Sequence, residues 1–233
     1  RPPKRIRNPA AIPNRIPRVN PNQRQPNRPA GPNPSQTINV RLSSTSMSHQ
    51  VSSHRLSANR SAILVIDFQT KLTPAIPSAD HAVEITDAVL EAADLLEVPS
   101  AATVQYPKGL GPLVDPLAER FPGPEDKLAF SSAVCRRELD RWSAQGRDQI
   151  LICGVETHIC VLQTVLDLLA EGLSPFVIAE AVAARGGQEH ELAIEQMRAA
   201  GATITSCESV LFQWIGSAEH PQFKSISQIV KSL

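Results

Sequence analysis

Short apolar runs alternate with amphipathic segments along the chain from residue 61 onward. Five of these runs, SAILVIDF, AATVQY, QILICGV, PFVIAEA and ATITSC, predict buried strands. After the first run, Ala82, Ile85 and Val89 recur at helical spacing, and Ile159, Leu162 and others do so after the third. This alternation predicts a three-layer α/β fold, in which a doubly wound parallel sheet of five or six strands is covered on both faces by helices.

Three further segments complete the expected order of elements. LAFSSAVCRRELDRWSAQG predicts a short strand followed by a helix, and the C-terminal segment 208–233 predicts two short helices separated near Pro221. The Gly- and Pro-rich segment 106–127 is too long for a simple connection, so we expect it to form a lid or a pocket wall.

The N-terminal region has a different composition from the rest of the chain. Residues 1–60 contain ten Arg, one Lys and no acidic residue, whereas residues 61–233 carry a net charge of −11. Ten of the 20 prolines lie in residues 1–46, and no apolar period accompanies them. Such a segment cannot bury enough apolar surface to offset its ordering entropy. We therefore expect a disordered extension over residues 1–58 and one folded domain over residues 59–233.

The role of this basic arm stays open between three interpretations. An Arg-rich arm without acidic residues is typical of targeting peptides or of nucleic-acid tethers, although its prolines disfavour an amphipathic transit helix. The third interpretation is an upstream extension without function, because Met47 offers a start just before the first strand. The expected location is cytoplasmic, or mitochondrial if the arm is a targeting segment, and we expect no nucleic-acid partner for the core.

The four cysteines and the hydropathy restrict the class of protein. Cys135, Cys153, Cys160 and Cys207 form no CxxC pair, so neither a disulfide framework nor a zinc ribbon is indicated. No stretch approaches 18 consecutive apolar residues, so we expect no membrane span and no membrane partner. There is also no phosphate-binding GxGxxG or GxxxxGK[ST] motif.

Three chemically useful side chains are predicted to converge on one edge of the sheet. Asp67 closes the first strand, Cys160 follows the strand QILICGV at the start of a helix, and Lys127 follows the long loop. A helix N-terminus stabilises a thiolate. Taken singly, an end-of-strand cap, a buried structural thiol and a solvated lysine are the simpler explanations. Together, an acid, a cation and a thiol at one sheet edge favour nucleophilic catalysis.

The motifs VIDFQ, EDKLAF and GVETHIC, with QYPKGLGPLV, AVAARGG and HPQFKSISQIVK, carry a resemblance. Through them residues 59–233 resemble the isochorismatase-like cysteine hydrolase superfamily, and most closely the isochorismatase domain-containing proteins. The resemblance implies a Rossmann-like topology and a catalytic triad of Asp67, Lys127 and Cys160. In this triad, Asp67 would take the proton from Cys160, Lys127 would hold carboxylate and substrate in register, and Cys160 would form an acyl-enzyme.

The resemblance also implies the surroundings of the triad. The Val155–Glu156 peptide bond would be cis, and the backbone N–H groups of Glu156 and Cys160 would form an oxyanion hole. Gln69 and Tyr106 stand just past strand ends, where they would contact substrate or pack the loops.

The resemblance further restricts the chemistry. The segment after the second strand lacks the D-x-H-type cluster of metal-dependent nicotinamidases, so neither a metal site nor an organic cofactor is implied. Vinyl-ether-cleaving isochorismatases tend to lack the nucleophilic cysteine. The retained cysteine therefore favours hydrolysis of a small substrate with an amide-like or ureide-like carbon–nitrogen bond.

Two further expectations concern partners and an alternative function. The alternative is a non-catalytic binding or assembly module on the same scaffold. A homo-oligomer is expected from the family likeness and from the apolar segment around Leu211, Phe212 and Trp214.

Overall fold

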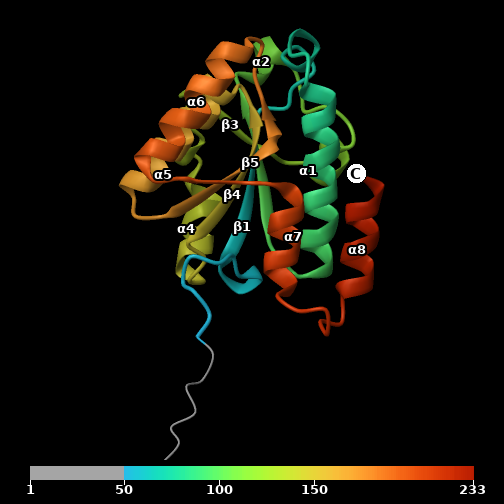
Figure 1. Cartoon of the computed structure of the whole chain (residues 1–233). Helices are drawn as coiled ribbons and strands as arrows, with labels where there is room; N and C mark the ends of the chain where they lie inside the picture. Colours follow the sequence, from blue (N-terminus) through green and yellow to red (C-terminus); the bar gives the residue numbers. More distant parts are fainter. Residues whose placement is uncertain (1–49) are drawn as a thin grey trace, which may run out of the picture. The chain divides into compact units, whose positions relative to one another are not determined.

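A computed structural model of the chain describes residues 50–233 (Figure 1). The part of the predicted disordered arm up to residue 49 lies outside the described residues. Just before the first strand, Leu56 is buried, and the N–H of Ser57 donates to Oε1 of Gln149 at 2.9 Å. The Nε2 of Gln149 in turn donates to the carbonyl oxygen of Arg55 at 2.9 Å. The chain is therefore attached to the core from Arg55 onward, a few residues before position 59.

Six parallel strands form one sheet, which confirms the predicted α/β architecture. The strand order is β3-β2-β1-β4-β5-β6, so the first strand lies near the middle and the order reverses beside it. The strands are β1 (Ser61–Ile66), β2 (Ser100–Gln105), β3 (Glu125–Lys127), β4 (Gln149–Val155), β5 (Ser174–Ala183) and β6 (Thr203–Thr205). In such a sheet ligands bind outside the carboxyl ends of the strands, where the order reverses. Here that point lies between β1 and β4.

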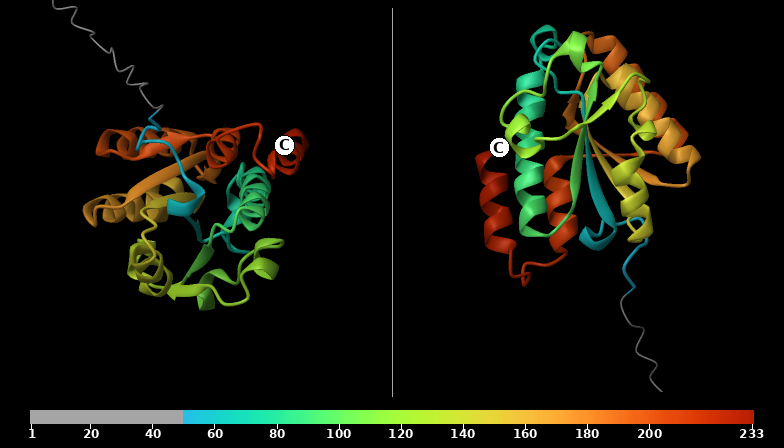
Figure 2. Two further views of the ribbon diagram at one scale, coloured as in Figure 1. Left: turned by 90° about the horizontal axis from the view of Figure 1, so that it is seen from below. Right: turned by 180° about the vertical axis from the view of Figure 1, so that it is seen from behind.

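Helices cover both faces of the sheet, as the sequence predicts (Figures 1 and 2). One layer holds α1 (Ala79–Leu95), α7 (Cys207–Ile215) and α8 (Phe223–Ser232), and the other holds α4 (Arg136–Ala144), α5 (Leu162–Ala170) and α6 (Gly187–Ala200). The short helices are η1 (Ala58–Arg60), η2 (Thr73–Ala75), α2 (Pro107–Leu110), α3 (Leu117–Arg120), η3 (Ser132–Val134) and the π-helical turn η4 (Thr157–Val161). Within residues 50–233, no helix has the length and apolar character needed to cross a membrane.

The strand β1 shows why the sheet has two covered faces. All six of its residues are buried, and alternate side chains point to opposite faces. Ile63 and Val65 join the core cluster that contains α1 and α7, whereas Leu64 and Ile66 join the cluster that contains α4 and α5. A continuous apolar run such as SAILVI is therefore what a strand between two helical layers requires.

The predicted strand at Leu128–Phe130 is wrong. The third strand comes directly before it, where Glu125, Asp126 and Lys127 pair with β2. Because β3 is an edge strand with one neighbour, it does not need the apolar pattern of a buried strand. The residues after it form a loop, in which Leu128 and Phe130 are 77% and 52% exposed.

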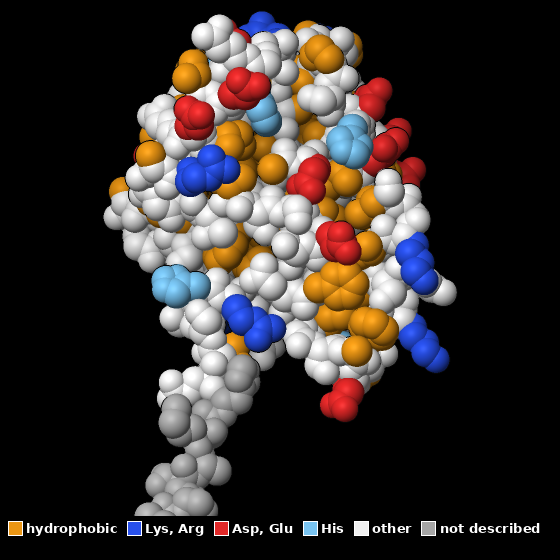
Figure 3. All heavy atoms as spheres, in the orientation of Figure 1, with side chains coloured by type: hydrophobic (Ala, Val, Ile, Leu, Met, Phe, Trp, Pro, Cys, Tyr) orange, Lys and Arg blue, Asp and Glu red, His pale blue; other side chains and the backbone are white. Residues whose placement is uncertain are grey.

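The predicted apolar contact surface at the C-terminal segment is also wrong for most of its residues. Leu211 and Trp214 are buried within the chain's own core, because α7 packs on the sheet. Phe212 is partly covered by Phe223 of α8, with ring centroids 6.5 Å apart. Figure 3 shows the hydrophobic side chains that remain at the surface over α7 and α8. The homo-oligomer therefore stays a prediction that rests on the family likeness.

Candidate active site

Asp67, Lys127 and Cys160 meet at the carboxyl edge of the sheet. Asp67 follows the last residue of β1, Lys127 ends β3, and Cys160 lies five residues after the end of β4. Asp67 leaves β1 with a left-handed backbone (φ 58°), a conformation that aspartate tolerates better than most residues. The parallel topology thus brings together three side chains that lie far apart in the sequence.

Asp67 and Lys127 form a fully buried ion pair. The Nζ of Lys127 lies 2.6 Å from Oδ2 of Asp67, and both side chains are 0% exposed. The same ammonium donates to Oε1 of Gln105 at 2.8 Å and to the carbonyl oxygen of Phe130 at 2.9 Å. Each of its three N–H groups therefore has one acceptor. A buried ammonium needs such complete pairing to offset the loss of hydration.

The Cys160 thiol interacts with both members of this ion pair. Burial raises the pKa of the thiol to about 12, and the Asp67 carboxylate adds to this rise, while the Lys127 ammonium opposes it. Cys160 is therefore a thiol at neutral pH. The helix start that the sequence associates with thiolate stabilisation is the π-helical turn η4, where burial favours the neutral thiol.

Burial also raises the pKa of the Asp67 carboxyl above its ordinary value of 3.8. Lys127, Cys160 and Thr103 oppose this rise. Thr103 in β2 donates to Oδ1 of Asp67 at 3.0 Å. A carboxylate with a raised pKa is a stronger base than an exposed one, and the adjacent ammonium favours its ionised form. Asp67 is thus suited to accept a proton from a neighbouring thiol.

A chain of hydroxyl groups connects Asp67 to the backbone of Cys160. Thr103 Oγ1 lies 2.9 Å from Ser132 Oγ, and the N–H of Ser132 donates to Thr164 Oγ1 at 2.8 Å. Thr164 in turn donates to the carbonyl oxygen of Cys160 at 2.6 Å. This chain fixes the turn that carries Cys160 relative to the carboxylate.

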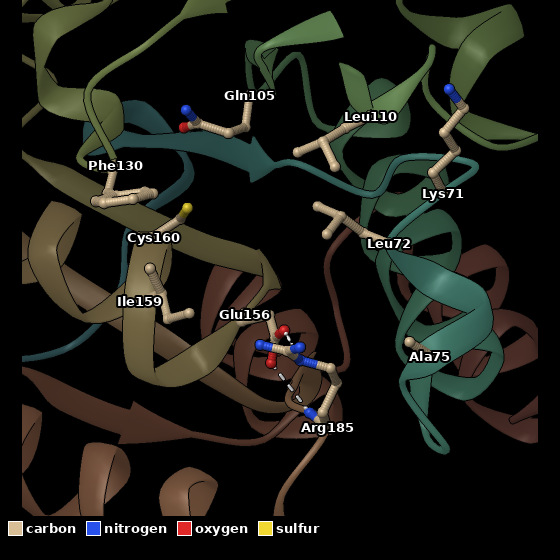
Figure 4. A pocket seen from close by; sticks show the side chains of 10 residues that line it. All are labelled: Lys71, Leu72, Ala75, Gln105, Leu110, Phe130, Glu156, Ile159, Cys160 and Arg185. Carbon is tan, nitrogen blue, oxygen red and sulfur yellow. Dashed lines mark hydrogen bonds and ion pairs between the residues drawn. The ribbon is translucent and has the colours of Figure 1, made fainter.

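Cys160 opens onto a pocket of about 210 Å³, which is smaller than the roughly 300–1,000 Å³ of drug-sized ligand sites. Figure 4 shows its sulfur pointing into the space between the side chains around it. The pocket is lined by Lys71, Leu72, Ala75, Gln105, Leu110, Phe130, Glu156, Ile159, Cys160 and Arg185. Its lining is mainly apolar with a few polar groups, and this composition suits a small organic molecule. Leu110 belongs to the long segment 106–127, so part of that segment forms a pocket wall, as predicted.

The turn between β4 and α5 places Cys160 at the pocket. The peptide bond between Val155 and Glu156 is cis. The N–H groups of Ile159 and Val161 both donate to the carbonyl oxygen of Glu156, at 3.0 and 3.3 Å. Because Ile159 and Val161 flank Cys160, these two hydrogen bonds fix the backbone on both sides of it.

The side chain of Glu156 is only 5% exposed and is held by Arg185 at the pocket wall. Its Oε1 forms an ion pair with Nε of Arg185, and its Oε2 accepts the backbone N–H of Arg185 at 3.0 Å. Figure 4 shows the guanidinium beside the Glu156 carboxylate.

Gln69 and Tyr106, which we expect to contact substrate or to pack the loops, do not line this pocket. Gln69 is 0% exposed and does not line the pocket. Its Nε2 donates to the carbonyl oxygens of Gln105 and Gly111, and its Oε1 accepts the N–H of Gln105, so it connects loops. Tyr106 is 51% exposed and lines a different hollow beside Pro107 and Leu128. The structure therefore favours loop packing for Gln69, the second of its two expected roles, and it places Tyr106 outside the pocket that contains Cys160.

Sequence reasoning missed several residues of the site. Gln105 lines the pocket and holds Lys127, and Arg185 follows the end of β5 by two residues. Both positions lie at strand ends, so the edge rule that found Asp67 could have found them. Ser132 and Thr164 carry no comparable signal, because only the packing of η3 against α5 brings them together. In residues 50–233, no group of three or more His, Cys, Asp and Glu side chains is placed to hold a metal ion.

The fold and this site define a class of protein: a doubly wound α/β protein with a cysteine beside a buried Asp–Lys pair. The family model of the isochorismatase domain matches residues 61–209. This match covers more than half of the chain, which therefore belongs to the isochorismatase domain family, an isochorismatase-like hydrolase family.

Relatives with known names agree with this assignment. Isochorismatase domain-containing protein 2A of Mus musculus is 38% identical over 181 residues, 76% of this chain and 85% of the relative. The secreted isochorismatase effector Isc1 of Phytophthora sojae is 38% identical over 187 residues, 76% of this chain and 87% of the relative. The solved structure of the MAR1 ribonuclease from Caenorhabditis elegans is 32% identical, with a TM-score of 0.71, and the match covers 76% of this chain and 92% of that one.

Proposed function

We propose that this chain is a cysteine-dependent hydrolase that cleaves the carbon–nitrogen bond of a small amide-like or ureide-like substrate. The observation that carries the proposal is that Cys160 lines a small pocket together with Gln105 and Phe130, which both accept a hydrogen bond from Lys127 of the buried Asp67–Lys127 pair. A thiol beside a base and a cation is the usual arrangement for nucleophilic catalysis.

The first half-reaction follows from the protonation states. Cys160 begins as a thiol and Asp67 as a carboxylate, so Sγ attacks the carbonyl carbon while its proton passes to Asp67. The carbonyl oxygen becomes an oxyanion, which the backbone N–H groups of Glu156 and Cys160 stabilise. The protonated Asp67 then gives its proton to the leaving nitrogen as the carbon–nitrogen bond breaks, and a thioester remains on Cys160.

The second half-reaction releases the acid. Asp67, ionised again, takes a proton from a water molecule as the water oxygen attacks the thioester carbonyl. The carbon–sulfur bond then breaks and the thiol regains its proton from Asp67. Lys127 keeps Asp67 ionised between the two half-reactions. Each removal of an oxyanion-hole donor typically raises the barrier of such a reaction by about 3 kcal/mol.

The test measures turnover and identifies the cysteine that carries a covalent adduct. The purified protein is incubated with a panel of primary amides and ureides, ammonia release is measured, and covalent adducts are located by mass spectrometry. We expect turnover with at least one compound and loss of turnover in Cys160→Ser. Any trapped acyl group should be attached to Cys160.

Cys135 offers a matched control. It is 6% exposed, as Cys160 is, and burial raises its thiol pKa to about 11, but it does not line the pocket. Cys135→Ser should therefore keep full turnover. If no compound is hydrolysed and no acyl group is trapped on Cys160, the non-catalytic binding module becomes the better account.

The name of the Caenorhabditis elegans relative raises a second reaction class, RNA hydrolysis. The small apolar pocket and the net charge of −11 over residues 61–233 disfavour an RNA strand at Cys160. A single-stranded RNA is therefore added to the panel. RNA cleavage that is lost in Cys160→Ser would overturn the carbonyl substrate.

A further inference from the structure

We infer that Leu72 and Leu110 form an apolar subsite for the acyl group, so that the hydrolase acts on primary amides of short aliphatic acids. This inference rests on the proposed function and names the substrate class of the same site.

The first observation is that Leu72 and Leu110 lie outside the hydrophobic core. Both line the pocket that contains Cys160. Within residues 50–233, neither leucine belongs to the two core clusters or to the partly buried side chains packed against them. Apolar side chains that face a cavity and not the core lose further contact with water only when an apolar group fills that cavity. The two leucines therefore favour an apolar ligand.

The second observation is that backbone hydrogen bonds hold the two leucines in place. Leu72 lies in the loop that follows β1, and Leu110 ends α2. The N–H of Lys71 donates to the carbonyl oxygen of Leu110 at 3.1 Å, and the N–H of Thr70 donates to that of Pro112 at 3.0 Å. The two loops are thus joined backbone to backbone beside both side chains. A wall that is already ordered costs little entropy when a ligand binds to it.

The third observation is the side of the pocket on which the proton donor lies. The Nζ of Lys127 contacts Asp67, and the same ammonium donates to Oε1 of Gln105 and to the carbonyl oxygen of Phe130. Figure 4 shows Gln105 and Phe130 beside the reactive sulfur, with Leu72 across the pocket from it. The leaving nitrogen takes its proton from Asp67, so it lies on the side of Gln105 and Phe130. The acyl chain, bonded to the other side of the carbonyl carbon, then points toward the leucines.

The burial of the ion pair limits the leaving group. The side chains of Asp67 and Lys127 are both 0% exposed. A nitrogen with a large substituent would have to displace the groups that are packed around them. The leaving nitrogen is therefore unsubstituted and departs as ammonia, which makes the substrate a primary amide.

The remaining lining and the size of the pocket limit the acyl chain. The charged side chains of the lining bind other protein groups, since Arg185 pairs with Glu156 and the Nζ of Lys71 donates to the carbonyl oxygen of Gly109 at 3.0 Å. The pocket volume is about 210 Å³. This equals roughly seven water molecules at about 30 Å³ each, so an amide group and a chain of a few carbon atoms fill the pocket.

The test compares amides that differ only in chain length. The ammonia-release assay gives kcat/KM for acetamide, propionamide, butyramide and valeramide. We expect kcat/KM to rise about fourfold for each added CH₂ group that the leucines bury, and to level off once the chain extends beyond the pocket. N-methylbutyramide, followed by the release of butyrate, should react about tenfold or more slowly than butyramide, because its nitrogen carries a substituent.

Variants assign the chain-length preference to the two leucines. Asparagine has nearly the shape of leucine but a polar end, so Leu72→Asn and Leu110→Asn should each lower the ratio of kcat/KM for valeramide to that for acetamide by about fourfold or more. This ratio is taken within one variant, so it does not depend on the fraction of the protein that is folded. Leu192→Asn is the matched control and should keep the wild-type ratio, because Leu192 is a 57% exposed leucine of α6 outside the pocket.

Two kinetic results would overturn the inference and leave the hydrolase intact. One is that kcat/KM stays level or falls along the series in the wild type. The other is that the rise survives unchanged in both leucine variants. In either case amides are turned over, so the proposed reaction stands and only its substrate class is wrong.

If no amide is turned over, binding decides. Ligand-observed NMR titrations of the Cys160→Ser protein then compare valeramide with acetamide. Tighter binding of valeramide that is reduced in Leu72→Asn would reject amide hydrolysis and keep the apolar subsite. Equal binding of the two amides, or no binding, would overturn the subsite as well.

Discussion

Thr103 donates through Oγ1 to Oδ1 of Asp67 at 3.0 Å, on the oxygen opposite to the one that Lys127 contacts. Both carboxylate oxygens are therefore held by donors inside the protein. Burial raises the pKa of Asp67, and these two donors oppose that rise. The balance sets the pH at which the proposed base becomes ionised.

Thr103→Val should shift the acid limb of activity to higher pH. Valine keeps the shape of threonine but removes the donor to Oδ1, so the pKa of Asp67 rises further and the carboxylate takes up a proton at a higher pH. In the acid limb, kcat/KM should fall by about tenfold or more relative to the wild type, while the plateau at higher pH changes little. The measurement is the pH profile of kcat/KM with an amide from the ammonia-release panel. An equal loss at all pH values would mean that Thr103 acts on structure and not on ionisation.

Asp67→Asn should separate the reactivity of the thiol from turnover. Removal of the carboxylate eliminates a charge that raises the pKa of Cys160 and leaves the opposing Lys127, so the thiol pKa should fall below about 12. Iodoacetamide should then modify Cys160 faster than in the wild type at mildly alkaline pH. Turnover should drop by about 100-fold or more, because no group remains to shuttle the proton.

Asp126→Asn is the control for this variant, since Asp126 is an exposed carboxylate on the same strand as Lys127. It should leave both alkylation and turnover at wild-type rates. Turnover retained by Asp67→Asn would show that another base serves Cys160.

Lys127→Met should destabilise the fold in a pH-dependent way. Removal of one partner of a buried ion pair leaves the Asp67 carboxylate without a counter-charge, which typically costs about 3–5 kcal/mol at neutral pH. Without Lys127 the pKa of Asp67 rises further, so acidification neutralises this carboxyl and the deficit relative to the wild type shrinks as the pH falls. Urea unfolding at neutral and mildly acidic pH measures both quantities.

The exposed Lys108 provides the comparison, because Lys108→Met should change the free energy of unfolding by less than about 0.5 kcal/mol at either pH. If the loss of unfolding free energy in Lys127→Met grows on acidification, the destabilisation does not come from an unpaired Asp67 carboxylate.

The sequence placed Asp67 and Cys160 at one edge of the sheet because each follows a predicted strand, and the carboxyl ends of parallel strands share one edge. Lys127 was placed beside them by the loop before it and by the resemblance, because the predicted strand came after it, whereas in the structure Lys127 ends β3. The apolar runs likewise located β1 and β4, whose residues are all buried. The strand β3 was misplaced by a few residues, since an edge strand with the sequence EDK carries no apolar pattern.

Other parts of the site depend on packing that no local pattern encodes. The position of Gln69 left substrate contact and loop packing open, and only the structure shows that its amide bonds to the backbone of Gln105 and Gly111. The contact between Ser132 and Thr164 joins segments 32 residues apart. The high pKa of Cys160 was also unforeseen, because it depends on burial by several elements and not on its place in a helix.

Gly154→Ala should destabilise the protein through the close approach of β4 and β1. A Cβ at position 154 would lie 2.5 Å from the carbonyl oxygen and 2.6 Å from Cβ of Ile66, and Gly154 has a φ of +152°. These atoms belong to a fully buried strand, so relief would require β1 itself to move, with Asp67 attached to its end. We expect the free energy of unfolding to fall by about 3 kcal/mol or more, the sum of an unfavourable φ and overpacking.

Gly146→Ala isolates the contribution of the unfavourable φ, because Gly146 also has a positive φ (+74°) but its Cβ would meet no atom within 4 Å. That variant should lose only about 1–2 kcal/mol in the same urea unfolding experiment. Equal losses in the two variants would show that backbone conformation alone, and not the contact with Ile66, requires glycine at position 154.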